Sequence, residues 1–145
     1  MDTVSKDVRS RNMAAIRSKN TKPEMILRSF LHKKGLRFRV HKVSLPGKPD
    51  LYLQKHETAI FVHGCFWHQH AKCKIAVLPK SHRNFWIPKL KGNILRGKKN
   101  IQELRAMGLN VVVVWECQIW DKNRGCIKEE FLNNLLSKIE GCKKR

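Results

Sequence analysis

Residues 59–73 combine a short apolar run with a dense group of side chains that can bind metal. Residues 59–62 are all apolar and predict a short buried strand, and the segment that follows them holds three histidines and two cysteines. No other stretch of the sequence is so rich in these residue types. We therefore expect the rest of the chain to be a scaffold that holds this segment against Asp50 and Cys117.

The charge of the chain points to a polyanionic partner. Its 145 residues are enough for one compact domain that needs no disulfides, and 31 basic against 11 acidic side chains give a net charge of +20. Nucleic acid is the leading candidate. An anionic membrane surface is the alternative, but the basic segments do not form one amphipathic helix, and no apolar run approaches the roughly 20 residues that span a bilayer.

The N-terminal residues and the cysteines indicate a cytosolic protein. Residues 1–10 lack the apolar region of a secretory signal, and residues 1–20 predict a basic arm, with a short helix, that orders on DNA. In a reducing compartment, five cysteines favour a metal site over disulfides. Cys126 and Cys142 stand apart in polar surroundings and are interpreted as free thiols.

A mixed α/β fold follows from the order of the predicted elements. Thr21, with Glu24 three residues later, forms a capping box that begins a helix ending at Gly35. Strands are predicted at residues 36–41, with one buried and one basic face, and at residues 50–53 and 58–62, forming a meander.

The second half of the chain predicts helices around one further strand. A helix that begins near residue 84 is expected to be interrupted by Pro88 and Gly92, and an amphipathic helix then runs to Gly108. The β-branched run at residues 111–115 predicts a central strand covered on both faces, and a last helix lies near the C-terminus. We therefore expect a mixed central sheet flanked by helices.

Asp50 is a candidate ligand for a divalent cation. Two adjacent antiparallel strands joined by a short turn place Asp50 beside Val62, at the end of the sheet where the histidine-rich segment begins. A carboxylate, together with water and phosphate oxygens, is a typical environment for Mg²⁺. The alternative is that Asp50 is an ordinary turn residue after proline.

A second metal site is predicted from the cysteines. Cys65, His70 and Cys73 have the spacing C-x₄-H-x₂-C, and Cys117 follows the strand at residues 111–115. Three thiolates and one imidazole form a closed tetrahedral site of the structural type, which suits Zn²⁺. The alternative is three buried thiols and a surface histidine.

Three motifs together resemble the very short patch repair (Vsr) DNA mismatch endonucleases. They are SLPGKPD at residues 44–50, FVHGCFWH at residues 61–68 and VVVVWEC at residues 111–117, and the similarity also includes the basic segment near the N-terminus. The resemblance implies a restriction-endonuclease-like fold, related to the PD-(D/E)xK nucleases, with one nuclease domain at residues 21–145 after an arm at residues 1–20. It also implies that the chain nicks the T-containing strand at T:G mismatches left by 5-methylcytosine deamination, which starts very short patch repair.

The resemblance also assigns roles to single residues. It implies that Asp50 and the backbone carbonyl of Val62 bind Mg²⁺, that His68 and His63 line the active site, and that Glu24 is catalytic, although the capping box explains Glu24 equally well. Val62 lacks the hydroxyl group of the threonine that some members carry at this position.

The remaining expectations concern zinc and DNA. The family's zinc ligands match Cys65, His70, Cys73 and Cys117, and its intercalating aromatic residues match Phe66, Trp67 and Trp86. Such wedges unstack a base step most easily at a mismatch. Phosphate contacts are expected from a set of basic side chains: Arg9, Arg11, Arg17, Lys19, Lys89, Lys91, Arg96, Lys98 and Lys99. The partners implied are a T:G duplex and mismatch-repair proteins, with the enzyme acting as a monomer.

Two other functions are compatible with the same residues. A restriction-type nuclease of this fold would cut both strands of perfectly paired DNA. A non-catalytic zinc module would bind DNA without cutting it, and its function would not depend on Asp50.

Overall fold

The computed structural model describes residues 21–74, 76–121 and 124–141. The predicted arm at residues 1–20, with the four basic side chains expected there to contact phosphate, and Cys142 lie outside these ranges. None of the helices in the described residues is both long and apolar enough to cross a membrane.

A four-stranded mixed sheet forms the centre of the fold. Its strands lie in the order β1 (Arg39–Val40), β2 (Leu51–Leu53), β3 (Thr58–His63) and β4 (Asn110–Trp115), with a 3₁₀ turn, η1 (Gln54–His56), between β2 and β3. The first three strands pair antiparallel, whereas β4 runs parallel to β3, with Val62 opposite Val114. The predicted meander and the mixed sheet are both confirmed.

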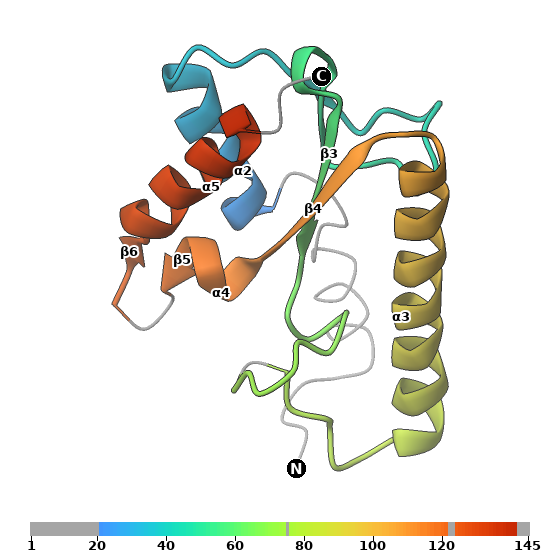
Figure 1. Ribbon diagram of the computed structural model, residues 1–145. Helices are drawn as coiled ribbons and strands as arrows, with labels where there is room; N and C mark the ends of the chain where they lie inside the picture. The colour runs from blue at the N-terminus through green and yellow to red at the C-terminus, as the bar shows by residue number, and fades with distance from the viewer. Residues whose placement is uncertain (1–20, 75, 122–123, 142–145) are drawn as a thin grey trace.

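Helices cover both faces of this sheet (Figure 1). On one side lie α2 (Lys22–Lys33), the short α4 (Glu116–Ile119) and α5 (Glu129–Gly141), and on the other side lies the long α3 (Arg83–Ala106). The larger core cluster joins α2 and α5 to β2, β3 and β4, and the smaller cluster joins Ala59 and Phe61 to Leu104 of α3. A two-stranded ribbon of β5 (Trp120–Asp121) and β6 (Cys126–Ile127) was not predicted from the sequence.

The capping box at the start of α2 forms as expected. Pro23 stands in the first helical turn, where its missing N–H costs no hydrogen bond, and the Thr21 N–H donates to Glu24 Oε2 at 3.2 Å. Leu27 and Leu31 lie on the inner face with no exposed surface. Burying each such side chain stabilises the fold by about 1.5–3 kcal/mol. These two residues hold α2 against the sheet.

The predicted interruption of α3 is wrong. The helix is continuous through Pro88 and Gly92 and ends at Ala106, with Gly108 in a left-handed conformation (φ +87°) just beyond it. Proline removes a single backbone hydrogen bond, and the many turns that follow Pro88, anchored by buried Leu90 and Leu104, outweigh that loss.

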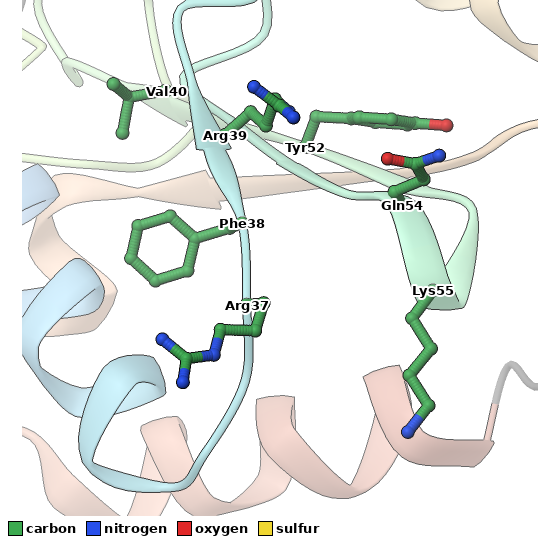
Figure 2. Close-up of a pocket in the computed structure, with 7 residues that line it drawn as sticks. All are labelled: Arg37, Phe38, Arg39, Val40, Tyr52, Gln54 and Lys55. Atoms are coloured by element: carbon green, nitrogen blue, oxygen red, sulfur yellow. The ribbon is translucent and has the colours of Figure 1, made fainter.

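The first strand is shorter and more exposed than predicted. Figure 2 shows Phe38 and Val40 on one side of the chain and Arg39 on the other, so the side chains alternate as in a strand. Only Arg39 and Val40 pair with β2, however, and Val40 is 44% exposed. The left-handed backbone at His41 (φ +46°) ends the strand, because it turns the chain out of the extended conformation.

The position of β4 also differs from the prediction. Both of its faces are covered, since Val112 and Val114 pack into the larger core and Val111 packs against the smaller core next to α3. It nevertheless lies at one edge of the described sheet and is not central. A hydrophobic run indicates that both faces of a strand are covered, but it does not indicate how many strands pair with its edges.

Candidate metal and catalytic site

The start of β2 brings Asp50 against the end of β3. The N–H of Val62 donates to Asp50 Oδ2 at 2.7 Å, which follows from the antiparallel register of β2 and β3. The predicted juxtaposition of Asp50 and Val62 is therefore present in the structure. The Asp50 side chain keeps 19% of its surface exposed, so it remains accessible to a ligand.

Glu24 reaches the same place from the first turn of α2. It is 1% exposed, and its two carboxylate oxygens have separate roles. Oε2 accepts the capping hydrogen bond from Thr21, while Oε1 lies 2.8 Å from His41 Nε2 and 3.3 Å from the Arg28 guanidinium. The two interpretations of Glu24 are compatible, because the cap uses only one oxygen and turns the other toward Asp50.

His41 is a third member of this group, and the sequence did not predict it. Its ring atom Nε2 lies 3.7 Å from Asp50 Oδ1, and its backbone N–H donates to the backbone carbonyl of Asp50 at 3.3 Å. The donor atoms of Glu24, His41 and Asp50 all lie within 4.8 Å of one another. In the sequence, His41 is the last residue on the basic face of the predicted strand, and nothing in this local pattern links it to a glutamate 17 residues away.

The two carboxyl groups affect each other's protonation. Burial and the neighbouring Glu24 carboxylate raise the pKa of Asp50 to about 7, although the bond from Val62 opposes this. Burial also acts to raise the pKa of Glu24, but Asp50, His41 and Arg28 together lower it below its ordinary value. Asp50 therefore resists ionisation beside an ionised Glu24, and a divalent cation bound between the two would favour ionisation of both.

His63 and His68 form a stacked pair next to this group. Their ring centroids are 3.8 Å apart at an interplanar angle of 6°. His63 directly follows Val62, whose N–H binds Asp50, so the pair and the carboxylates share one end of β3. Within the described residues, no hydrogen bond or ion pair joins the two histidines to Glu24 or Asp50.

Both imidazoles of this pair are held in the neutral form. Burial lowers the pKa of His63 to about 3, with a further contribution from the charge of His68. Burial also lowers the pKa of His68, and the Arg96 charge adds to this effect. Gly97 of α3 lies over the pair, since a Cβ there would be 3.9 Å from both rings. Each neutral imidazole keeps one unprotonated ring nitrogen that can accept a hydrogen bond from a water molecule.

The four predicted zinc ligands come together in space. The donor atoms of Cys65, His70, Cys73 and Cys117 lie within 4.8 Å of one another. His70 Nδ1 is 3.7 Å from Cys65 Sγ and 3.4 Å from Cys117 Sγ. In a tetrahedral site with Zn–S of about 2.3 Å and Zn–N of about 2.0 Å, these separations would be about 3.5 Å. The donor set therefore fits zinc in both chemistry and spacing.

The surroundings of the cysteine group also hold it in place. Burial raises the pKa of the Cys65 and Cys117 thiols, so a metal would be needed to keep them as thiolates. The Cys65 N–H donates to Glu116 Oε1 at 3.0 Å. Trp115 stacks on His70 at 4.1 Å and meets the edge of His63 at 5.2 Å, so one indole contacts both groups. Neither role was predicted for these two residues. Cys126 is an exposed free thiol, as predicted.

The aromatic side chains predicted to enter DNA form a cluster. Phe66 lies 5.2 Å from Trp67 and 5.4 Å from Trp86, measured between ring centroids. Phe85, which was not singled out, joins them at 5.1 Å from Trp86 and is 55% exposed. Lys89 Nζ lies over the rings of both Trp67 and Phe85. The loop after β3 and the start of α3 thus share one aromatic surface.

Basic side chains are also exposed along α3. All five that were predicted to contact phosphate, namely Lys89, Lys91, Arg96, Lys98 and Lys99, are exposed. A separate hollow of about 820 Å³ lies between β1 and the end of β2, lined by Arg37, Tyr52 and Lys55 among others (Figure 2). It includes none of the predicted site residues, so the candidate site lies outside it.

Comparison with known proteins gives consistent matches. A family profile described as DNA mismatch endonuclease Vsr matches residues 1–74, a range that includes Glu24, Asp50 and Cys73 but not Cys117. The type II nicking enzyme V.XorIIP of Xanthomonas oryzae is 45% identical over 120 residues, covering 83% of this chain and 88% of that protein. V.NmeAIP, a type II nicking enzyme of Neisseria meningitidis, is 42% identical over 139 residues, covering 96% of each. The DNA mismatch endonuclease Vsr of Escherichia coli is 38% identical over 135 residues, covering 93% of this chain and 85% of that protein.

Proposed function

Because the chain belongs to the Vsr family and is a DNA nicking endonuclease of that family, we propose that it nicks the T-containing strand at T:G mismatches. Such mismatches arise when 5-methylcytosine deaminates, and the nick would start very short patch repair. In this proposal residues 21–145 are one nuclease domain with a restriction-endonuclease-like fold, which residues 1–20 precede as a DNA-binding arm.

One observation carries the proposal: a carboxylate pair and a histidine pair share the end of β3. Asp50 accepts a hydrogen bond from Val62, and the next residue, His63, stacks on His68. Phosphodiester hydrolysis needs a nucleophilic water, neutralised phosphate charge and a proton for the leaving oxygen. Acidic ligands beside neutral imidazoles supply groups for each of these needs.

In the proposed site, Asp50 and the Val62 carbonyl would hold Mg²⁺, with Glu24 next to them. The raised pKa of Asp50 supports this assignment, since a nearby cation would favour the ionised carboxylate that the fold alone disfavours. When bound, the cation neutralises phosphate charge and lowers the pKa of a coordinated water. His68 would orient that water and exchange a proton with it, and His63 would hold the ring of His68 in place by stacking.

Zinc would have a structural role in this proposal. Four protein ligands, Cys65, His70, Cys73 and Cys117, leave no open position for substrate, so the ion would brace the loop after β3. That loop carries His68 and two of the three wedge residues, Phe66 and Trp67, so bracing it would fix the position of these two rings relative to His68.

The wedge residues would provide the sensing of the mismatch. Phe66, Trp67 and Trp86 would enter the duplex beside the T:G pair, where unstacking costs least, while exposed lysines and arginines of α3 contact phosphates. Lys89 lies close enough to Trp67 to contact a phosphate next to the inserted ring.

The experiment that tests this function is a nicking assay on a panel of T:G, other mismatched and matched duplexes in varied sequence contexts, with Mg²⁺. We expect a nick beside T in T:G duplexes, and Asp50→Ala should retain binding to the same duplex but lose cleavage. Equal cleavage of matched DNA would contradict the mismatch specificity. Full activity of Asp50→Ala would contradict the proposed site.

A further inference from the structure

The group around Asp50 contains a nitrogen donor as well as two carboxylates. His41 Nε2 lies 2.8 Å from Glu24 Oε1 and 3.7 Å from Asp50 Oδ1. Adjacent ligands of an octahedral ion with bonds of about 2.1 Å are about 3 Å apart. The separation of His41 from Glu24 is close to this value, that of His41 from Asp50 is longer, and all three donor atoms lie within 4.8 Å of one another.

The backbone holds His41 in this position at some conformational cost. Its φ of +46° is in the left-handed region, which non-glycine residues seldom adopt outside constrained sites. The hydrogen bond from the His41 N–H to the Asp50 carbonyl fixes this turn against β2. The imidazole is therefore directed at the carboxylates by main-chain structure that also positions Asp50.

Arg28 closes the other side of the group. Its guanidinium lies 3.3 Å from Glu24 Oε1 and 3.4 Å from His41 Nε2. The positive charge of Arg28 keeps Glu24 ionised. Because Arg28 occupies one side of the group, the side next to Asp50 is left for an ion that binds both Glu24 and His41.

From this arrangement we propose that His41 is a direct ligand of the catalytic cation and that the site prefers first-row transition dications to Mg²⁺. The inference rests on the proposed function, because it concerns the same cation site. Mg²⁺ takes oxygen ligands almost alone, whereas transition dications accept imidazole nitrogen in mixed sets of histidine and carboxylate.

The test uses Mn²⁺ as the probe, on zinc-loaded full-length protein without DNA. Pulsed electron paramagnetic resonance detects nitrogen bonded to Mn²⁺, and titration followed by the same signal gives its dissociation constant, with Mg²⁺ as competitor. The wild-type complex should show nitrogen coupling. In His41→Asn the coupling should vanish, with Mn²⁺ affinity falling about tenfold or more and Mg²⁺ affinity changing less than about threefold.

Two variants serve as controls for folding and for histidine content. Asparagine tolerates the left-handed backbone at residue 41, and His41→Gln provides a second replacement of nearly the original reach. His32→Asn removes an exposed histidine from the last turn of α2 and should leave the coupling unchanged. Zinc content and thermal unfolding of each variant are measured alongside.

The outcomes separate this inference from the proposed function. Absence of nitrogen coupling in the wild type, or its persistence in both His41 variants, would overturn the role of His41. Equal losses of Mn²⁺ and Mg²⁺ affinity would overturn the metal preference. If Asp50→Asn bound Mn²⁺ as tightly as the wild type, the cation site of the proposed function would itself be wrong.

Discussion

Replacing Asp50 with asparagine is expected to stabilise the metal-free protein above pH 7 and to remove its stabilisation by Mg²⁺. Burial and Glu24 raise the pKa of Asp50 from 3.8 to about 7, so the folded state binds more protons than the unfolded chain between these values. The stability that Asp50 contributes is therefore complete below pH 3.8 and is lost as the pH rises through about 7. At pH 8 the ionised group is a net cost, which asparagine avoids.

The size of this effect follows from the same values. A pKa difference of about 3 corresponds to a ceiling of about 4 kcal/mol. The Asp50 side chain is 19% exposed, and Glu24, whose pKa shifts in the opposite direction, offsets part of the difference. We expect a gain of about 1–2 kcal/mol for Asp50→Asn at pH 8, and little difference at pH 4. Asparagine can still accept the hydrogen bond from Val62.

Urea unfolding followed by tryptophan fluorescence measures this difference. The protein should be zinc-loaded and free of other divalent ions, and each series should be repeated with saturating Mg²⁺. Wild type should gain stability from Mg²⁺ while Asp50→Asn should not, and Asp121→Asn, in β5, is the matched control. The reasoning is refuted if Asp50→Asn is less stable than wild type at pH 8 and still responds to Mg²⁺.

The remaining predictions concern zinc, pH and DNA. Metal analysis should find about one zinc per chain, lost in Cys117→Ser but kept in Cys126→Ser, and a zinc-free wild type would contradict the cluster. Because the pKa of His63 is lowered to about 3, its burial lowers the free energy of unfolding as the pH falls below about 6.5, by up to about 1.4 kcal/mol per pH unit. In urea unfolding at a series of acidic pH values, the free energy of unfolding of His63→Gln should therefore fall less steeply than that of the wild type. Equal slopes for the two proteins would contradict this role of His63. Trp67→Ala should weaken binding to a T:G duplex about tenfold or more in a filter-binding or anisotropy assay, with a smaller loss on matched DNA; equal losses would count against a wedge.

Local sequence signals predicted much of the fold and of the site. The capping box at Thr21 located α2, and the turn between two short strands was enough to place Asp50 beside Val62. The spacing of Cys65, His70 and Cys73 predicted a cluster because these ligands lie in one loop. In each case the determining contacts are close in sequence or are set by strand register.

What the sequence did not predict depends on contacts between distant elements. His41 joins Glu24 only because α2 packs beside the end of β1, and its left-handed backbone has no signature in a histidine. The continuity of α3 through Pro88 depends on buried leucines outweighing one lost hydrogen bond. The edge position of β4 is a matter of lateral pairing, on which a hydrophobic run carries no information.

The most direct test of the account is cleavage of a single T:G duplex whose two strands carry different labels. With Mg²⁺ or Mn²⁺ present, we expect one nick, beside T, with the G-containing strand and the matched duplex left intact. Cleavage of both strands, or of matched DNA at the same rate, would contradict it.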